Sequence, residues 1–150
     1  MGLLLAVASG CGTPTEPRSA ERLVGSWRDL SEASGHAGPS EVVLTIGSDR
    51  SFTWDMRVYG AHPGQDPSAV SGYMTIFGTY TTNGNSLRFT GERRVGWDRA
   101  LGPDVVEEAY EQDMYENATF QVIRNTLVLR YTTYPADAPQ LTTKIFVRVR

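Results

Sequence analysis

The sequence predicts an all-β protein, an eight-stranded antiparallel up-and-down β-barrel with one short helix near residues 103–116. Three observations lead to this prediction. Apolar and polar residues alternate with a period of two in several segments, tight turn signals separate many of these segments, and 15 glycines and eight prolines accompany many Thr, Tyr, Val and Phe residues. Short strands divided by frequent turns have this composition, whereas helical bundles seldom do.

The clearest strands are three segments, residues 52–59, 126–132 and 144–150, in which apolar and polar side chains alternate. A period of two places the apolar side chains on one face, which is typical of a half-buried strand. The apolar residues expected to face the core are Phe52, Trp54, Met56 and Val58, then Leu127, Leu129 and Tyr131, and then Ile145, Val147 and Val149.

Five further strands are expected near residues 23–30, 41–47, 73–81, 86–94 and 117–123. Turn signals occur at residues 47–50 (GSDR), 83–85 (NGN) and 124–125 (RN). Such short connections make neighbouring strands antiparallel and adjacent in the sheet. Eight strands of this length can remove their edges by closing into a barrel, whose interior takes side chains or one small ligand.

Two connections are too long to be simple turns. Residues 60–72 (GAHPGQDPSAVSG) contain three glycines and two prolines, so they predict a loop. In residues 103–116, Pro103 suits a first helical position, and Val106, Tyr110 and Met114 recur every four residues. This segment therefore predicts an amphipathic helix, whose apolar side is expected to pack on one end of the barrel as a lid.

One ordinary domain accounts for the length of the chain, with the barrel expected over residues 22–150. The formal net charge of -3 gives no whole-chain attraction to nucleic acid, so we expect no nucleic-acid partner. Cys11 is the sole cysteine, which excludes an internal disulfide.

The N-terminal segment combines a short apolar run over residues 3–8 (LLLAVA), the small residues Ser9 and Gly10, and Cys11. This arrangement resembles the end of a bacterial lipoprotein signal peptide. The resemblance implies that residues 1–10 are removed as a signal peptide and that Cys11 is acylated and anchors the protein to a membrane. The alternative is that residues 1–10 form a buried strand or helix of a cytosolic protein, since ten residues are too few to span a bilayer.

Residues 11–21 contain two prolines and little that could be buried, so they predict a flexible tether between the anchor and the barrel. Gly12 follows the cysteine, where the resembling lipoproteins carry aspartate when they are retained in the inner membrane. The expected location is therefore the bacterial cell envelope, with the outer membrane and periplasm favoured.

The first barrel strand begins with Gly25-Ser26-Trp27, and here the chain resembles lipocalin-like (calycin) domains, whose first strand opens with Gly-x-Trp. The resemblance implies that Trp27 closes one end of the barrel beside Gly25, and that an arginine of the last strand, Arg148 or Arg150, packs over it. The segment 78–89 is also similar to the central hairpin of bacterial lipocalin-like lipoproteins.

Motifs for catalysis or metal binding are absent from the sequence: it contains no G-x-S-x-G elbow, no H-E-x-x-H and no paired cysteines. His36 and His62 lie in Gly- and Pro-rich segments and are expected to be exposed loop residues. Glu107 and Glu111 could share a hard cation, although a solvated acidic face is the simpler interpretation. We therefore expect no enzyme activity, no cofactor and no metal.

The leading functional hypothesis is a binding protein that takes a small apolar or amphipathic ligand in the barrel or at its mouth. Trp54 is also a candidate for the core, and Trp97 could line the mouth or pin the helix, while Arg93 and Arg94 are expected to pair with the acidic side of that helix. The candidate ligand-binding residues are Phe52, Trp54, Met56, Phe89, Tyr110, Met114, Leu129 and Tyr131.

Two alternatives remain open at this stage. One is a solid barrel that acts as an envelope protein-interaction, inhibitor or structural module and contacts its partner through the loops 31–40 and 60–72. The other is an enzyme, which would need a cluster of polar groups converging inside the barrel.

Overall fold

A computed structural model of the chain describes residues 19–29, 40–60, 64 and 66–150. Several predictions lie outside these residues: the signal peptide 1–10, the acylation site Cys11, tether residues 11–18, loop residues 31–39, and the histidines His36 and His62. Helix α1 begins at Ser19, inside the segment 11–21 that the sequence predicts to be a tether.

The described chain consists almost entirely of strands joined by short connections. The elements in chain order are α1 (Ser19–Leu23), β1 (Gly25–Asp29), β2 (Ser40–Ile46), β3 (Ser51–Tyr59), β4 (Val70–Asn83), β5 (Ser86–Asp98), β6 (Val106–Ala109), β7 (Asp113–Ile123), β8 (Thr126–Thr133), the 3₁₀ turn η1 (Pro135–Asp137) and β9 (Gln140–Arg148).

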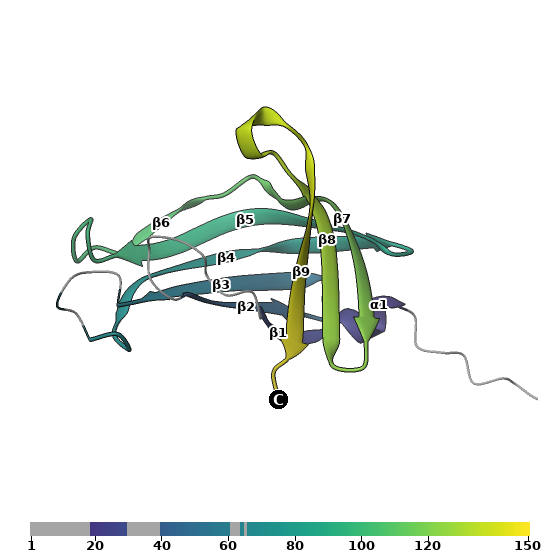
Figure 1. The fold of residues 1–150 in the computed structure, drawn as a ribbon, viewed down its shortest axis with the longest axis horizontal. Coiled ribbons are helices and arrows are strands. Elements are labelled where there is room, and N and C mark those ends of the chain that lie inside the picture. The colour runs from purple at the N-terminus through teal and green to yellow at the C-terminus, as the bar shows by residue number, and fades with distance from the viewer. Residues whose placement is uncertain (1–18, 30–39, 61–63, 65) are drawn as a thin grey trace, which may run out of the picture.

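The predicted eight-stranded antiparallel barrel is confirmed. Neighbouring strands pair in the order β4-β3-β2-β1-β9-β8-β7-β5, and the pairing of β4 with β5 closes the ring. Strand β6 is an addition outside this ring, because it pairs with β5 beyond the part of β5 that pairs with β7. In Figure 1, β7, β8 and β9 stand upright across the β2 to β5 side, so the barrel is strongly twisted.

The two ends of the barrel differ. One end, which we call the helix end, carries α1, the C-terminus and the tight turns between β2 and β3, β4 and β5, and β7 and β8. The other end, which we call the loop end, carries the longer connections, including residues 99–105 and 134–139. Strands β3, β4 and β5 with β6 extend toward the loop end past the crossing of β7 to β9 (Figure 1).

The predicted helix over residues 103–116 was wrong, because these residues form β6 and the start of β7. Val106, Tyr110 and Met114 are four residues apart, and four is an even number, so the same spacing also places them on one face of an extended chain. Backbone pairing decides between the two: Val106–Ala109 pairs with Arg93–Gly96, and Tyr110 N donates to Glu92 O at 2.9 Å. The edge of β5 overrides the helical pattern.

The predicted face of the last strand was also wrong. Ile145 and Val149 are 45% and 37% exposed, whereas Phe146 between them is fully buried. Lys144 and Arg148 lie on the inner side with Phe146, because Lys144 pairs with Asp29 and Arg148 packs on Trp27. Two charged residues with specific interior partners therefore reverse the side that hydrophobicity alone predicts.

Inward-facing side chains from every strand of the ring form one core. The largest fully buried side chains are Trp27, Phe89, Phe146, Leu23, Leu44, Ile46, Leu127 and Leu129. Phe52 and Phe89 meet edge to face with ring centroids 4.9 Å apart, a geometry favoured between aromatic rings. The core is therefore filled by protein side chains through the body of the barrel.

Candidate binding site at the loop end of the barrel

The helix end is closed by Trp27, Gly25 and Arg148, the last of which is one of the two arginines that the resemblance to lipocalin-like domains offered. Trp27 is fully buried and pairs in register with Arg148, whose guanidinium carbon lies 4.2 Å from the centre of the indole ring. Trp27 Nε1 donates to Leu23 O at 2.8 Å, and Arg148 donates to Val24 O at 2.9 Å. Gly25 lies directly under the guanidinium, since a Cβ built there would be 2.3 Å from Arg148 Nη1.

The eight candidate ligand-binding residues separate into two groups. Four are core residues: Phe52, Phe89, Leu129 and Tyr131, each at most 9% exposed. The other four are partly buried and pack against the edge of the core: Trp54, Met56, Tyr110 and Met114. Only the second group is accessible to a ligand, and Met56 is the member that lines a groove at the loop end.

An apolar groove of about 530 Å³ lies on the inner side of the strand extension at the loop end. Cross-strand partners form its floor, because Met56 pairs with Met74 and Val58 with Gly72, while Met74 also pairs with Gly96. Side chains at paired positions share one face of a sheet, so these residues make a continuous surface. The residues that line the groove include Met56, Val58, Met74, Arg94, Val106 and Glu108.

A charged pair borders this groove. The Arg94 guanidinium donates to the Glu108 carboxylate across the β5–β6 pairing, and it also lies 5.8 Å from the centre of the Tyr110 ring. On the outer face, Arg93 donates to Glu107 at 2.7 Å and stacks 4.3 Å from the Phe77 ring. The predicted pairing of these arginines with the acidic segment is confirmed, although the partner is a strand.

Trp97 holds the connection 99–105 against the sheet. Its Nε1 donates to Gly102 O at 2.9 Å, and its ring lies beside Tyr73, the residue opposite it on β4, with centroids 6.5 Å apart. The same connection contributes Leu101 and Asp104 to the groove. Trp97 therefore pins a loop, where the sequence predicted a helix.

A bulge in β7 brings one further residue into the barrel that sequence analysis did not identify. Leu87 pairs with Ala118 and Phe89 with Met114, so residues 115–117 stand opposite Arg88. Tyr115 and Asn117 both have positive φ angles, 54° and 53°, which residues other than glycine adopt at a cost. A β-bulge of this kind changes the direction in which a side chain points.

The Tyr115 side chain points from this bulge into the barrel interior. Its hydroxyl accepts a hydrogen bond from Trp54 Nε1 at 3.0 Å, and its ring meets Tyr131 edge to face at 4.8 Å. Burial raises the pKa of the Tyr115 hydroxyl far above its ordinary value. Tyr115 thus joins the β3 side to the β8 side across the interior.

An ion pair lies on the other side of the interior. Lys144 Nζ is 2.6 Å from Asp29 Oδ2, and the Asp29 side chain is 4% exposed. Burial raises the pKa of Tyr131, and the negative charge of Asp29 raises it further. The loop end of the barrel therefore has an apolar wall on β3 and β4 and a polar wall on β1, β8 and β9.

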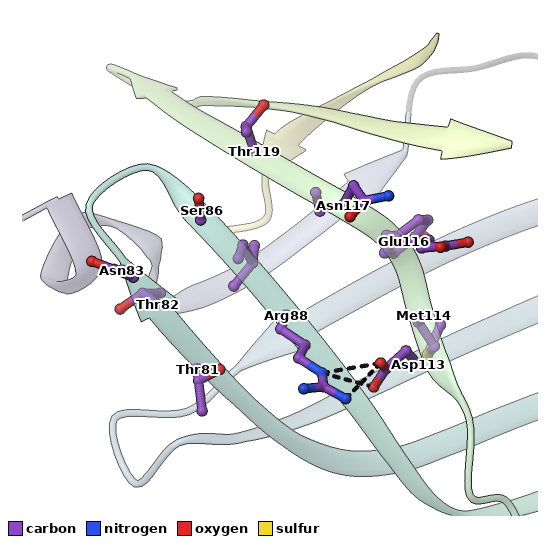
Figure 2. A pocket seen from close by; sticks show the side chains of 13 residues that line it. Thr81, Thr82, Asn83, Ser86, Arg88, Asp113, Met114, Glu116, Asn117 and Thr119 are labelled. Atoms are coloured by element: carbon purple, nitrogen blue, oxygen red, sulfur yellow. Dashed lines mark hydrogen bonds and ion pairs between the residues drawn. The ribbon is translucent and has the colours of Figure 1, made fainter. Parts of the chain in front are cut away.

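A second groove, of about 730 Å³ and mixed polar and apolar lining, lies between the β4–β5 hairpin and β7. Figure 2 shows Arg88 of β5 reaching across to Asp113 of β7. Arg88 Nη2 lies 2.8 Å from Asp113 Oδ2. Arg88 and Thr90 lower the pKa of Asp113 through hydrogen bonds. Threonines, serine and asparagines make up most of its remaining polar lining, and its apolar lining comes from Leu87, Met114, Tyr115 and Ala118. Met114, one of the candidate ligand-binding residues, therefore lies in this groove and not in the groove at the loop end.

In residues 19–29, 40–60, 64 and 66–150, no group of three or more His, Cys, Asp or Glu side chains could hold a metal ion. No helix within these residues is long and apolar enough to cross a membrane.

The described residues define a closed, antiparallel eight-stranded β-barrel with a filled core and an amphipathic groove at its loop end. Comparison with protein-family models, with curated proteins and with solved structures found no match to this chain.

Proposed function

We propose that this protein is a lipid-anchored binding protein of the bacterial cell envelope, and that it takes a small amphipathic ligand in the groove at the loop end. The observation that carries the proposal is the continuous apolar floor of Met56, Val58 and Met74 beside the Arg94–Glu108 pair. An apolar surface with a few fixed polar groups is the usual composition of a small-molecule site.

The size and chemistry of the groove favour a compact ligand. About 530 Å³ falls within the range of roughly 300–1,000 Å³ that is typical of small-molecule pockets. Met56 and Met74 have flexible, polarizable side chains, which suit ligands of irregular shape. The ligand's apolar part would lie on the methionines, and its polar part would meet Arg94 and Glu108.

Binding of a dansylated fatty acid tests this proposal, with fluorescence of the dansyl group as the measurement. Met74→Glu places a carboxylate on the groove floor and is expected to weaken binding at least tenfold. Leu141→Glu makes the same chemical change at a residue 71% exposed on β9 and should leave binding unchanged. Equal affinity of Met74→Glu and the unsubstituted chain would contradict the proposal.

Mass spectrometry of lipid extracts can then identify the natural ligand, starting from protein purified from its native host. The expected result is one co-purifying species that is lost from Met74→Glu and retained by Leu141→Glu.

The anchor is proposed on the apolar run at residues 3–8 and the small residues before Cys11. Cells that express the full chain and are fed labelled palmitate should incorporate the label, and Cys11→Ser should abolish it. Label that persists in Cys11→Ser would contradict anchoring at this residue.

We also infer that the barrel is lipocalin-like. Supporting observations are the first-strand Gly25-x-Trp27 and the stacking of Arg148, from the last strand, on Trp27. Both residues lie at the helix end, and the groove lies at the loop end.

A second candidate function, a protein-interaction or inhibitor module with no small-molecule ligand, is favoured by the filled body of the barrel and by apolar side chains on the outside of β9. Leu141 and Ile145 are 71% and 45% exposed. Crosslinking in cells distinguishes the two functions, because a defined protein adduct through the barrel surface, with no bound lipid, is expected of the second.

A further inference from the structure

Three arginines surround a pocket at the helix end of the barrel. The pocket has a volume of about 370 Å³ and is lined by Arg22 of α1, Val122 of β7, Arg124 of the β7–β8 turn and Arg148 of β9. No acidic side chain is among the described residues that line it. Side chains from four different parts of the chain, three of them arginines, thus line one opening.

The backbone around this pocket is fixed by hydrogen bonds among the same segments. Arg148 donates through its guanidinium to Arg22 O at 2.7 Å and to Val24 O at 2.9 Å, which ties β9 to α1. Its backbone N–H donates to Asn125 O at 2.8 Å, which ties β9 to the β7–β8 turn. Stacking on Trp27 holds the Arg148 guanidinium itself. The arginines are therefore brought together by the closure of the barrel.

This pocket differs in the charge of its lining from the two grooves described above. The loop-end groove includes Asp98, Asp104 and Glu108 beside Arg94, and the groove of Figure 2 includes Asp113 and Glu116 beside Arg88. Glu21 of α1 and Asp49 of the β2–β3 turn also lie at the helix end, but neither lines the pocket. A chain with a formal net charge of -3 thus has a pocket lined by arginines at its helix end, while acidic side chains line the groove at its loop end. Such a separation orients a protein in an electric field near a charged surface.

Apolar side chains lie next to the arginines on the outside of the barrel. Ile123, directly before Arg124, is 52% exposed, and Val149, directly after Arg148, is 37% exposed. A surface that combines arginines with exposed aliphatic side chains fits the interface of a lipid bilayer, where phosphates lie above acyl chains.

We propose that this arginine pocket, formed by Arg22, Arg124 and Arg148, is a contact surface for the phosphate headgroups of an anionic lipid bilayer. The proposal rests on the anchored function proposed above for its placement. Eight residue steps separate Cys11 from Ser19, and at about 3.3 Å per residue they reach at most about 26 Å. Helix α1, which begins at Ser19 and carries Arg22, would therefore stay close to the membrane.

Contact through the helix end fixes the orientation of the barrel. The loop end lies at the opposite end of the strands, so its groove would face away from the bilayer and remain open to ligand. The acidic side chains Asp98, Asp104 and Glu108 near that groove would be repelled by an anionic surface, which favours the same orientation.

Vesicle co-sedimentation tests the proposal with the full chain carrying Cys11→Ser, so that no acyl group contributes. Vesicles of phosphatidylcholine with phosphatidylglycerol are compared with vesicles of phosphatidylcholine alone. We expect binding to the anionic vesicles that weakens with added salt. Arg22→Gln with Arg124→Gln should lower the affinity about 25-fold, at about fivefold per arginine near the surface. Arg148 is left unchanged because it packs on Trp27.

The matched control is Arg99→Gln with Arg130→Gln, which makes the same change in net charge at two exposed arginines outside the pocket. Its affinity for anionic vesicles should stay within about twofold of the unsubstituted chain. Three results would overturn the proposal: equal binding to neutral vesicles, equal loss in both double variants, or saturable binding of inorganic phosphate without vesicle binding. Palmitate labelling of Cys11 is independent of this assay, so failure of the anchor and failure of the arginine pocket are distinguishable.

Discussion

Gly25 is constrained twice, by its backbone and by its neighbour. Its φ angle is 139°, a conformation that side-chain-bearing residues rarely adopt, and the Arg148 guanidinium occupies the space where a Cβ would lie. We expect Gly25→Ala to lower the free energy of unfolding by about 2–4 kcal/mol, through backbone strain and loss of the stacking on Trp27. Urea unfolding monitored by tryptophan fluorescence measures the change.

Gly102 provides the control for this substitution. Its φ angle is also positive, 122°, but no atom lies within 4 Å of a Cβ built there. Gly102→Ala therefore introduces the backbone strain without the contact with arginine and should cost about 1–2 kcal/mol. If both variants lose the same stability, the position of Arg148 over Gly25 has no energetic consequence.

The Asp29–Lys144 pair is expected to stabilise the interior of the barrel. Asp29 is 4% exposed and Lys144 is 24% exposed, so removal of the lysine leaves a carboxylate largely without water. Lys144→Met should lower the free energy of unfolding by about 2–4 kcal/mol. Adding Asp29→Asn to Lys144→Met should restore part of this loss, and urea unfolding of the four combinations gives the coupling energy. Simple additivity would show that the two side chains do not interact.

The buried hydroxyl of Tyr115 makes the free energy of unfolding depend on pH in the alkaline range. Burial raises its pKa above the ordinary value of 10.0, so the unfolded chain loses this proton at a lower pH than the folded chain. The stability contributed by the neutral hydroxyl is complete below pH of about 10 and declines as pH rises above it. Urea unfolding between neutral and alkaline pH should show this decline, and Tyr115→Phe should reduce its slope. An unchanged slope would place the alkaline loss elsewhere.

The roles of some single residues could be predicted from the sequence, and those of others could not. Trp27 and Gly25 belong to a local motif, and Arg148 was one of two arginines that the resemblance offered for the contact with Trp27. Tyr115 has no such signal, because its inward direction depends on three residues of β7 standing opposite one residue of β5. The pairing register of two strands decides that direction, and hydrophobicity along one strand does not contain it.

Ion pairs on both faces of the sheet hold β6 to β5. Arg93 pairs with Glu107 on one face and Arg94 with Glu108 on the other, and four cross-strand positions align. We expect Glu107→Lys with Glu108→Lys to detach β6, because like charges then face each other across the pair. Hydrogen exchange of peptides covering residues 104–112 should accelerate at least tenfold, while peptides from β8 stay protected.

Reversing the charges on both strands is the control. Arg93→Glu and Arg94→Glu, added to the two lysine substitutions, recreate opposite charges in exchanged positions. Hydrogen exchange of residues 104–112 should then return toward that of the unsubstituted chain. If exchange stays fast, charge pairing is not what holds β6.

The barrel itself was predictable because a period of two persists through most strands, and short turns leave few ways to arrange them. Two elements were not, for distinct reasons. In residues 103–116, a spacing of four fits a helix and a strand equally, and the open edge of β5 decided the outcome. In β9, Lys144 and Arg148 face the interior, where they contact Asp29 and Trp27 of β1. The pattern along β9 could not predict this direction, because both partners lie on another strand.

Closure of the ring makes the molecule a single cooperative unit. The first strand pairs with the last, at Trp27 with Arg148 and Asp29 with Phe146, so the ladder closes between opposite ends of the described chain. We expect tryptophan fluorescence and far-ultraviolet circular dichroism to give coincident urea transitions. Two separate transitions would show that the strand extension at the loop end melts independently of the ring.

The placement of β6 outside the ring also affects how copies of the protein meet in a crowded solution. An outermost strand presents backbone donors and acceptors that a neighbouring molecule could extend into an intermolecular sheet. Here that strand has four residues, two of which are glutamates. Because β6 is short and negatively charged, it offers little backbone with which a strand of another molecule could pair. This should protect concentrated protein against edge-to-edge aggregation.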